Sequence, residues 1–241
     1  MKLIAADWSA PDHIQAFTTT RLGGCSEGVY RSFNLGDHVE DAAAHVAANR
    51  ALLGEQFQGL KAPQWLSQVH GTVLIKASEQ GVVEADACWT DEVGQPCIVM
   101  TADCLPVFFS DKNGSRVAVA HAGWRGLVDG VLEQTLSVFA NPSEVQVWLG
   151  PAIGPLAFEV GDEVRERFCD LITASSDAFI ATSTPHKWMA DIYQLARLRL
   201  QAAGVQHITG GDFCTFTQSE LFYSYRRDGV TGRMASVIWI A

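Results

Sequence analysis

Short runs of apolar residues, separated by turns that contain glycine, proline or asparagine, recur along the whole chain. The densest runs lie in the middle, at residues 96–101, 105–110 and 116–121. Apolar runs of roughly four to eight residues between turns are typical of buried strands, so we expect three consecutive strands here. The sequence Asp111-Lys112-Asn113-Gly114 predicts the turn between the last two. The same criteria predict further strands at 16–20, 64–70, 73–76, 145–149, 206–209 and 235–240.

Helical spacing of apolar residues marks longer segments between these strands. The predicted helices are residues 41–53, 126–139, 160–168 and 189–203. Asp41 could cap the first of them. Because the strands in the middle are not each followed by a helix, a doubly wound parallel sheet is disfavoured. The pattern predicts an α+β fold, with mixed β-sheets flanked by helices, in a single domain that spans residues 1–241.

The composition fits a globular protein whose partners are neither nucleic acids nor membranes. Of the 241 residues, 48% are apolar, and the net charge is −10. Binding to nucleic-acid phosphates or to an anionic membrane needs a basic surface, which this balance disfavours. No apolar run approaches the roughly 18 residues of a membrane span, and Asp7 interrupts the N-terminal run before a secretory core could form. We therefore expect a cytoplasmic protein whose six cysteines, none in a Cys-x-x-Cys pair, are thiols.

Three metal-ligating side chains stand at the ends of predicted strands. Cys104 and His121 each follow or end an apolar run, and His70 ends a short strand just before Gly71. Two imidazoles and one thiolate that converge on one ion leave a fourth position open, the pattern of a catalytic zinc site. Zinc held in this way makes hydroxide available near neutral pH. The spacing equally allows each residue to be a packed or hydrogen-bonded strand end. The remaining histidines are interpreted as surface or cap residues: His13, His38, His45, His186 and His207.

Asp103, next to Cys104, is a carboxylate flanked by apolar strands. Burial would force it to protonate unless it is paired or hydrogen-bonded. Two roles are open. It could orient a metal-bound histidine, or it could form a salt bridge to an arginine such as Arg125.

Arginines beside glycine loops suggest an oxyanion pocket. Arg125 lies in His121-Ala122-Gly123-Trp124-Arg125-Gly126, which has the pattern of a strand-to-helix turn with free backbone N–H groups. Arg21 precedes Gly23-Gly24, and Arg226 and Arg227 follow Ser224-Tyr225. A phosphate group would fit among such side chains. The alternative is that the arginines balance the 27 acidic residues at the surface, which suits Arg227 best.

Several motifs together resemble one known family. In order along the chain they are TTTRLGGCS, FNLGDHV, SQVHG, MTADCLPV, HAGWRGL, LGPAIGPLAFEVG, DIYQLARLRL, CTFT and YSYRRDGVTGRMAS. From about residue 16 to the C-terminus, the sequence resembles the multicopper polyphenol oxidase or laccase-domain (YfiH-like) family, regarded as purine nucleoside phosphorylases.

The resemblance implies a metal site, a reaction and a fold. The implied metal ligands are His70, Cys104 and His121, with zinc or Cu²⁺ as the ion. The implied reactions are phosphorolysis of adenosine, inosine, guanosine and S-methyl-5′-thioadenosine, together with adenosine deamination. Purine nucleosides and phosphate would then be the partners. The implied fold is similar to the deamidase domain of cytotoxic necrotizing factor.

These reactions need an acid–base group and a phosphate site. Besides Cys104 and His121, the carboxylates of Asp103 and Glu159 are the candidates for proton transfer. The candidates for binding phosphate or ribose are Arg21, Asn34, Arg125, Glu159 and Arg226.

Other functions compete with this prediction. Multicopper oxidases need many histidines, several in His-x-His pairs, whereas this chain has seven histidines and no such pair. Weak copper-dependent oxidation of phenols at the His/Cys/His site is still possible, because copper outcompetes zinc for such ligands. Cys104 and His121 could instead form a metal-independent thiol hydrolase, an amidase that edits peptidoglycan precursors. A third alternative is a binding protein without enzymatic activity.

Overall fold

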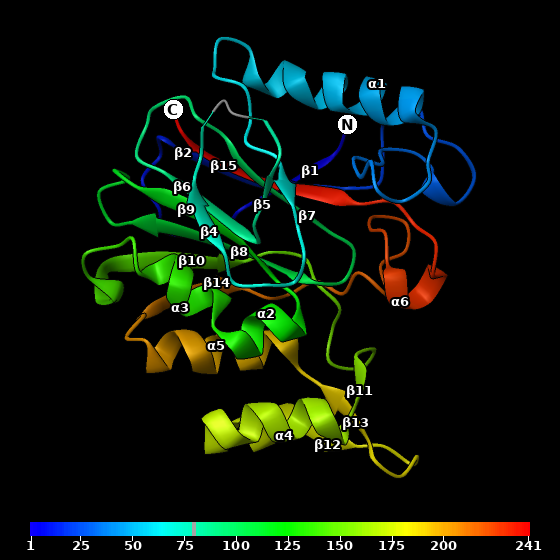
Figure 1. Cartoon of the computed structure of the whole chain (residues 1–241), viewed down its shortest axis with the longest axis vertical. Helices are drawn as coiled ribbons and strands as arrows, with labels where there is room; N and C mark the ends of the chain where they lie inside the picture. The colour runs from blue at the N-terminus through cyan, green and yellow to red at the C-terminus, as the bar shows by residue number, and fades with distance from the viewer. Residues whose placement is uncertain (79–80) are drawn as a thin grey trace.

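Two stacked β-sheets form the centre of the molecule, with helices on both outer faces (Figure 1). The structure is a computed structural model, and it describes residues 1–78 and 81–241. The strands of the first sheet pair antiparallel throughout. In spatial order they are β1 (Leu3–Ala5), β2 (Ile14–Thr19), β15 (Met234–Ile240) and β7 (Cys97–Thr101).

The second sheet is mixed, as the sequence predicts. Its central pairs are antiparallel, and the two edge strands, β14 and β4, pair parallel with their neighbours. In spatial order its strands are β14 (His207–Gly210), β10 (Val145–Leu149), β8 (Leu105–Asp111), β9 (Val117–Ala122), β6 (Ala87–Thr90) and β4 (Leu74–Lys76).

Two smaller sheets and the helices complete the domain. The smaller sheets contain β11 (Glu159–Gly161), β13 (Lys187–Ala190) and β12 (Phe179–Ala181), and β3 (Leu66–Ser67) with β5 (Val83–Glu84). The α-helices are α1 (Ala43–Gly54), α2 (Trp124–Asp129), α3 (Val131–Leu136), α4 (Asp162–Leu171), α5 (Ile192–Ala202) and α6 (Tyr225–Asp228). The 3₁₀ helices are η1 (Gly28–Tyr30), η2 (Glu55–Phe57), η3 (Pro142–Glu144) and η4 (Thr173–Ala178).

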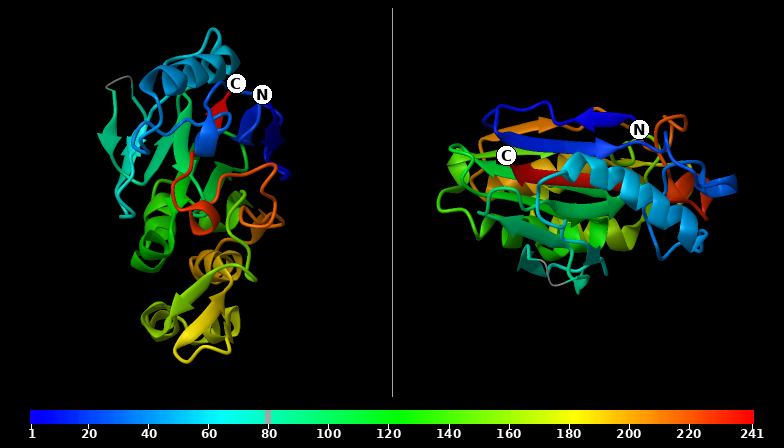
Figure 2. Two further views of the ribbon diagram at one scale, coloured as in Figure 1. Left: turned by 90° about the vertical axis from the view of Figure 1, so that its right-hand side faces the viewer. Right: turned by 90° about the horizontal axis from the view of Figure 1, so that it is seen from above.

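Both faces of the central strands are buried, which explains their unbroken apolar runs. In β8, Phe108 packs between the two sheets, whereas Val107 and Phe109 pack on the opposite face, against α2, α3 and α5. The outer face of the first sheet is covered by α1, through Leu53. Two further views show this order of layers, with α4 and the β11–β13 sheet at the end opposite α1 (Figure 2). The result is one α+β domain with mixed sheets and flanking helices.

Two predicted helices differ from the observed ones. The segment 126–139 begins earlier and is broken into α2 and α3 at Gly130, whose φ of 104° is left-handed and does not fit a continuous helix. The segment 189–203 begins later, because its first residues pair in β13. Asp41 does not cap α1; Ala42 takes that position without a side-chain bond.

All six cysteines are free thiols, as expected. None of the helices in the part of the chain that the structure describes is long and apolar enough to span a bilayer.

Candidate active site

The imidazoles of His70 and His121 and the thiol of Cys104 meet in one place. His121 lies on β9, His70 follows β3, and Cys104 lies in the loop between β7 and β8. Their ligand atoms all lie within 4.8 Å of one another, and Cys104 Sγ is 3.8 Å from His70 Nε2. Among the described residues, this is the one group of three or more such side chains that could hold a metal ion.

A carboxylate that the sequence reasoning missed holds this cluster together. Asp86, fully buried just before β6, accepts a hydrogen bond from His121 Nδ1 at 2.8 Å. It also accepts hydrogen bonds from the backbone N–H groups of Val69, His70 and Gly71. With the Nδ1 proton of His121 held by Asp86, its Nε2 is left for Cys104 or a metal. The burial argument applied to Asp103 would have found Asp86, which lies between two alanines at the start of an apolar strand.

The Cys104 thiol and the His121 imidazole shift each other's pKa in opposite directions. Burial alone would raise the pKa of Cys104, but the charge and hydrogen bond of His121, helped by His70, lower it to about 6. Burial alone would lower the pKa of His121, but the Cys104 thiolate and the Asp86 carboxylate raise it to about 9. Between these two values the metal-free pair is a thiolate beside an imidazolium.

In metal-free protein, alkylation of Cys104 by iodoacetamide is expected to reach half its maximal rate near pH 6. The thiolate is the reactive form and accumulates above the pKa, so a lowered pKa moves the reactivity to lower pH. In His121→Gln the half-maximal pH is expected to rise to the ordinary thiol value of about 8.5 or above. Mass spectrometry of each cysteine would measure this, with exposed Cys25 as the internal reference. A Cys104 rate that follows Cys25 across the pH range would contradict the ion pair.

The cluster opens into a hollow of about 470 Å³. A second hollow of about 340 Å³ adjoins it and shares the lining residues His38, Gln68 and Met100. The other residues that line the first hollow are His70, Thr101, Ala102, Asp103, Cys104, His121, Arg125, Ile153, Phe158, Tyr225, Arg226 and Arg233.

Two glycines of the HAGWRG motif allow this close approach. A Cβ at Gly123 would lie 2.7 Å from His70 Cδ2 and 3.0 Å from Cys104 Sγ. A Cβ at Gly126 would lie 2.7 Å from the carbonyl oxygen of Gly71, in the loop that carries His70. A glycine at 123 leaves room for the His70 imidazole and the Cys104 sulfur, and a glycine at 126 leaves room for the backbone of the His70 loop, as the sequence interpretation of this turn expected.

Asp103 takes neither of the two roles open to it. Its carboxylate accepts hydrogen bonds from Thr215 Oγ1 at 2.6 Å, Ser224 Oγ at 3.0 Å and the backbone N–H of Arg226 at 2.7 Å. The C-terminal segment therefore satisfies this buried group, while Asp86 orients the histidine. Although Asp103 lines the hollow, its oxygens are held by these donors. These bonds join the Cys104 loop to the segment that carries α6.

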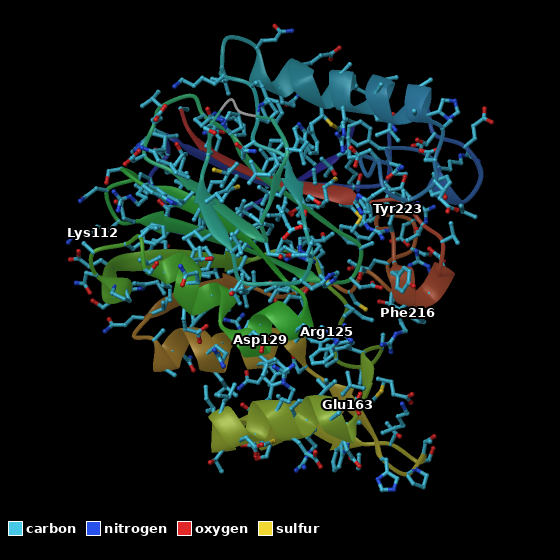
Figure 3. The ribbon with its side chains drawn as sticks, viewed as in Figure 1. Lys112, Arg125, Asp129, Glu163, Phe216 and Tyr223 are labelled. Atoms are coloured by element: carbon cyan, nitrogen blue, oxygen red, sulfur yellow. The ribbon has the colours of Figure 1, made fainter. Side chains whose placement is uncertain are left out.

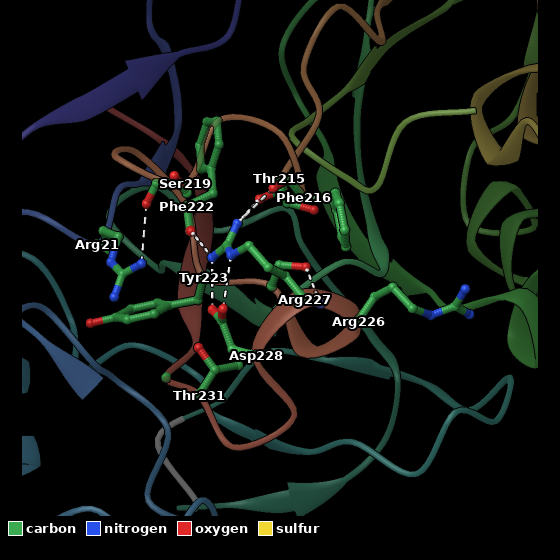
Figure 4. Close-up of polar contacts among 12 residues, drawn as sticks. Arg21, Thr215, Phe216, Ser219, Phe222, Tyr223, Arg226, Arg227, Asp228 and Thr231 are labelled. Atoms are coloured by element: carbon green, nitrogen blue, oxygen red, sulfur yellow. Dashed lines mark hydrogen bonds and ion pairs between the residues drawn. The ribbon is translucent and has the colours of Figure 1, made fainter. Parts of the chain in front are cut away.

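The structure does not bring Arg21 or Glu159 to the hollow. Arg21 donates to the carbonyl oxygen of Ser219 and stacks over the ring of Tyr223 (Figure 4). It also donates to the carbonyl oxygen of Arg31. Glu159 is exposed on β11, and its backbone carbonyl accepts a hydrogen bond from Arg226. Both residues lie outside the lining of the hollow.

Asn34 is also outside the hollow, because it is fully buried and its amide is used for packing. Its oxygen accepts from the backbone N–H groups of Gly36 and Arg233, and its nitrogen donates to Gly36 and Asp41. Arg227, which the sequence suggested to be a surface charge, instead holds the C-terminal segment together. It donates to three backbone carbonyls of that segment and pairs with Asp228 (Figure 4).

Besides the two histidines of the cluster, three arginines and His38 line the hollow. Arg125 and Arg226 are among those expected from the sequence, and Arg125 lies at the start of α2 (Figure 3). The guanidinium of Arg125 is 4.4 Å from the centroid of the Trp124 ring. Arg233 and His38 were missed. Arg233 directly precedes the last strand, so the strand-end argument that selected His121 could have found it.

The donor set fits a bound metal. Two imidazoles and a thiol that titrates near neutral pH are the ligands that zinc and copper prefer. The oriented ring of His121 and the space beside Gly123 are the features such a site needs.

The similarity to known proteins extends over nearly the whole chain. Residues 15–241 match the family described as Multi-copper polyphenol oxidoreductase laccase. The chain is 50% identical over 238 residues to a purine nucleoside phosphorylase of Pseudomonas aeruginosa, with 98% of each chain covered. It is 51% identical over 242 residues to the purine nucleoside phosphorylase YfiH of Escherichia coli, with 99% of each covered. A crystal structure of a Neisseria meningitidis protein superposes with a TM-score of 0.95 at 46% identity, over 100% of this chain and 99% of that one.

Proposed function

Because the chain belongs to the multi-copper polyphenol oxidoreductase laccase family, we propose that it is a purine nucleoside phosphorylase with its active site at His70, Cys104 and His121. The observation that carries this proposal is the meeting of the donor cluster and several basic side chains in one hollow. The names of the Pseudomonas and Escherichia relatives support it.

The hollow suits a nucleoside and phosphate in size and in charge. Its volume of about 470 Å³ is within the usual range of small-molecule sites. Arg125, Arg226 and Arg233 supply positive charge on its wall in a protein whose net charge is −10. Phe158 and Tyr225 offer aromatic surface on which a purine could stack.

In phosphorolysis, a phosphate oxygen forms a bond to C1′ of the ribose while the bond from C1′ to the purine nitrogen breaks. The electron pair leaves with the purine, which takes up a proton. The basic side chains hold the phosphate, and His121, charged in the metal-free state, is positioned by Asp86 to hold or move a proton at Nε2. A bound zinc or copper ion would supply Lewis-acid chemistry, held by His70, Cys104 and His121.

We further propose that the substrates are adenosine, inosine, guanosine and S-methyl-5′-thioadenosine, and that adenosine is also deaminated to inosine in the same hollow. Deamination consumes water and releases ammonia, so it needs no phosphate. This difference separates the two reactions experimentally.

Wild-type protein incubated with inosine is expected to release hypoxanthine and ribose 1-phosphate only when phosphate is present. With adenosine, inosine and ammonia are expected even without phosphate. Chromatography of both reactions, together with the metal content of the purified protein, measures these outcomes. Absence of any phosphate-dependent base release at high enzyme concentration would contradict the phosphorylase function.

One observation favours a second candidate function. Cys104, His121 and Asp86 form the arrangement of a catalytic triad, with Cys104 as nucleophile, His121 as base and Asp86 as the orienting carboxylate. The pKa of Cys104 is lowered to about 6, as such a nucleophile requires. A metal-independent amidase acting on peptidoglycan precursors, with a fold like that of the necrotizing factor deamidase domain, would use this triad. Exhaustive chelation separates the candidates: such an amidase would keep its activity, whereas the metal-assisted enzyme would lose it.

A further inference from the structure

On the basis of the phosphorylase function above, we propose that inorganic phosphate, and the phosphate group of ribose 1-phosphate in the reverse reaction, binds at the start of β15 between Arg233, Thr101 and His38. These three residues line the same hollow as the His/Cys/His cluster.

Arg233 is a half-buried cation with no carboxylate of the described residues at ion-pair distance, although the more distant charges of Cys104 and Asp103 act to raise its pKa. Its Nη1 donates to the carbonyl oxygens of Thr231 and Gly232, and no described carboxylate pairs with it. Burial lowers the pKa of Arg233, which reflects the loss of water around its charge. Removing water from a guanidinium costs free energy unless an anion replaces that water. Phosphate can do so, because its oxygens match the planar arrangement of the guanidinium N–H donors.

The backbone and stem of Arg233 are fixed before any ligand arrives. Its N–H donates to the side chain of Asn34 at 2.9 Å. Its stem passes so close to Gly36 that a Cβ there would lie 2.8 Å from Arg233 Cγ. Asn34, predicted from the sequence to contact phosphate or ribose, thus holds the residue that we infer to bind phosphate.

Thr101 offers a hydroxyl without a partner. Its side chain is buried at the end of β7, and Oγ1 makes no hydrogen bond to any described residue. The antiparallel register pairs Thr101 with Met234, the neighbour of Arg233, so the two strand ends lie side by side. A buried hydroxyl that lines a cavity beside a guanidinium without a carboxylate partner can donate to a phosphate oxygen.

The third residue of the site, His38, is exposed and lines both hollows. Its Nδ1 lies 3.5 Å from the Asp37 carboxylate. Partial desolvation and the nearby charge of Arg233 lower the pKa of His38 despite Asp37, so the ring is neutral at pH 7 and its other nitrogen can face a phosphate without adding charge. It lies where the two hollows meet, next to Met100.

The other two arginines are less suited to hold phosphate. Arg125 is exposed and lies on Trp124, and Arg226 is exposed and donates to the carbonyl oxygen of Glu159. Exposed guanidiniums are already hydrated, so they gain less from an anion than Arg233 does. They remain available to the nucleoside.

Arg233→Met tests the site, with Arg167→Met as the matched control because Arg167 pairs with Asp129 at the surface. Loss of a charged hydrogen-bonded contact is expected to raise the KM for phosphate about 10- to 100-fold. The KM for inosine is expected to change less than about twofold, because only phosphate contacts are lost. Arg233→Lys is expected to give an intermediate KM for phosphate, since lysine keeps the positive charge but not the planar set of guanidinium donors. If Arg233→Met does not fold, Thr101→Val tests the same site, and it is expected to raise the KM for phosphate by a smaller factor.

Direct binding separates this site from the proposed function. Line broadening of inorganic phosphate in ³¹P NMR spectra is expected with wild type and Arg167→Met, and its loss with Arg233→Met. Phosphate binding that depends on Arg233 without any phosphorolysis would support the site and overturn the phosphorylase function. Phosphorolysis with an unchanged KM for phosphate in Arg233→Met and Thr101→Val would overturn the site and leave the function intact.

Discussion

Cys104→Ala is expected to lower kcat/KM for phosphorolysis and deamination by about a thousandfold or more. The sulfur is the one soft donor in the cluster, and its thiolate is the negative charge that offsets a bound cation. Without it, two imidazoles remain, and the ion is expected to be lost on dialysis. Steady-state kinetics and the metal content of the same preparation measure both effects.

Cys169→Ala is the matched control, because Cys169 is also a partly exposed free thiol but lies on α4, away from the hollow. It is expected to keep wild-type kinetics and metal content. If Cys104→Ala retained phosphorolysis at the wild-type rate, the assignment of the active site to this hollow would be wrong. Loss of only one of the two reactions would show that they occur at different sites.

Asp86→Asn is expected to lower metal affinity about 10- to 100-fold. It is also expected to lower the free energy of unfolding by about 2 to 4 kcal/mol. Both oxygens of Asp86 accept from N–H groups, so the amide nitrogen of asparagine would face a donor whichever way it turned. Metal titration and chemical denaturation of metal-free protein measure the two quantities separately.

A purely structural role for Asp86 would lower stability without moving the titration of Cys104. The pH profile of Cys104 alkylation in Asp86→Asn is therefore the deciding measurement. Loss of the carboxylate lowers the pKa of His121, and the thiolate of Cys104 then loses part of its partner charge. The half-maximal pH should rise. Asp91→Asn, which removes a carboxylate paired with Lys76 and Arg116 near the surface, should leave it unchanged.

The donor trio could be predicted because each member ends an apolar run, and strand ends are where side chains leave a core. The central strands β7, β8, β9 and β10 were predicted within one or two residues for the same reason. The break at Gly130 was not, because a left-handed glycine inside an apolar stripe leaves the helical period almost unchanged.

The residues that support the trio were harder to find. The sequence could have marked Asp86 as a buried carboxylate and Arg233 as a strand-end cation, but the contacts that join them to His70 and to Asn34 depend on the fold. Arg21 and Asn34 were selected because glycine loops and polar side chains resemble a ligand site, yet both fasten the loop that they belong to. Local sequence gives the chemistry of a side chain, whereas its partners depend on tertiary packing.

The contacts of Asp103 have a consequence for the order in which the protein folds. Its bond to Thr215 joins residues 112 positions apart, and its bond to the backbone of Arg226 joins residues 123 positions apart. Asp86 and His121 are only 35 positions apart, and Asp86 and His70 only 16. Since the entropy lost on closing a loop grows with its length, the segment from 70 to 121 can assemble first. During synthesis, therefore, the ligands can meet and capture an ion before the C-terminal third has been made and closes the cavity around them.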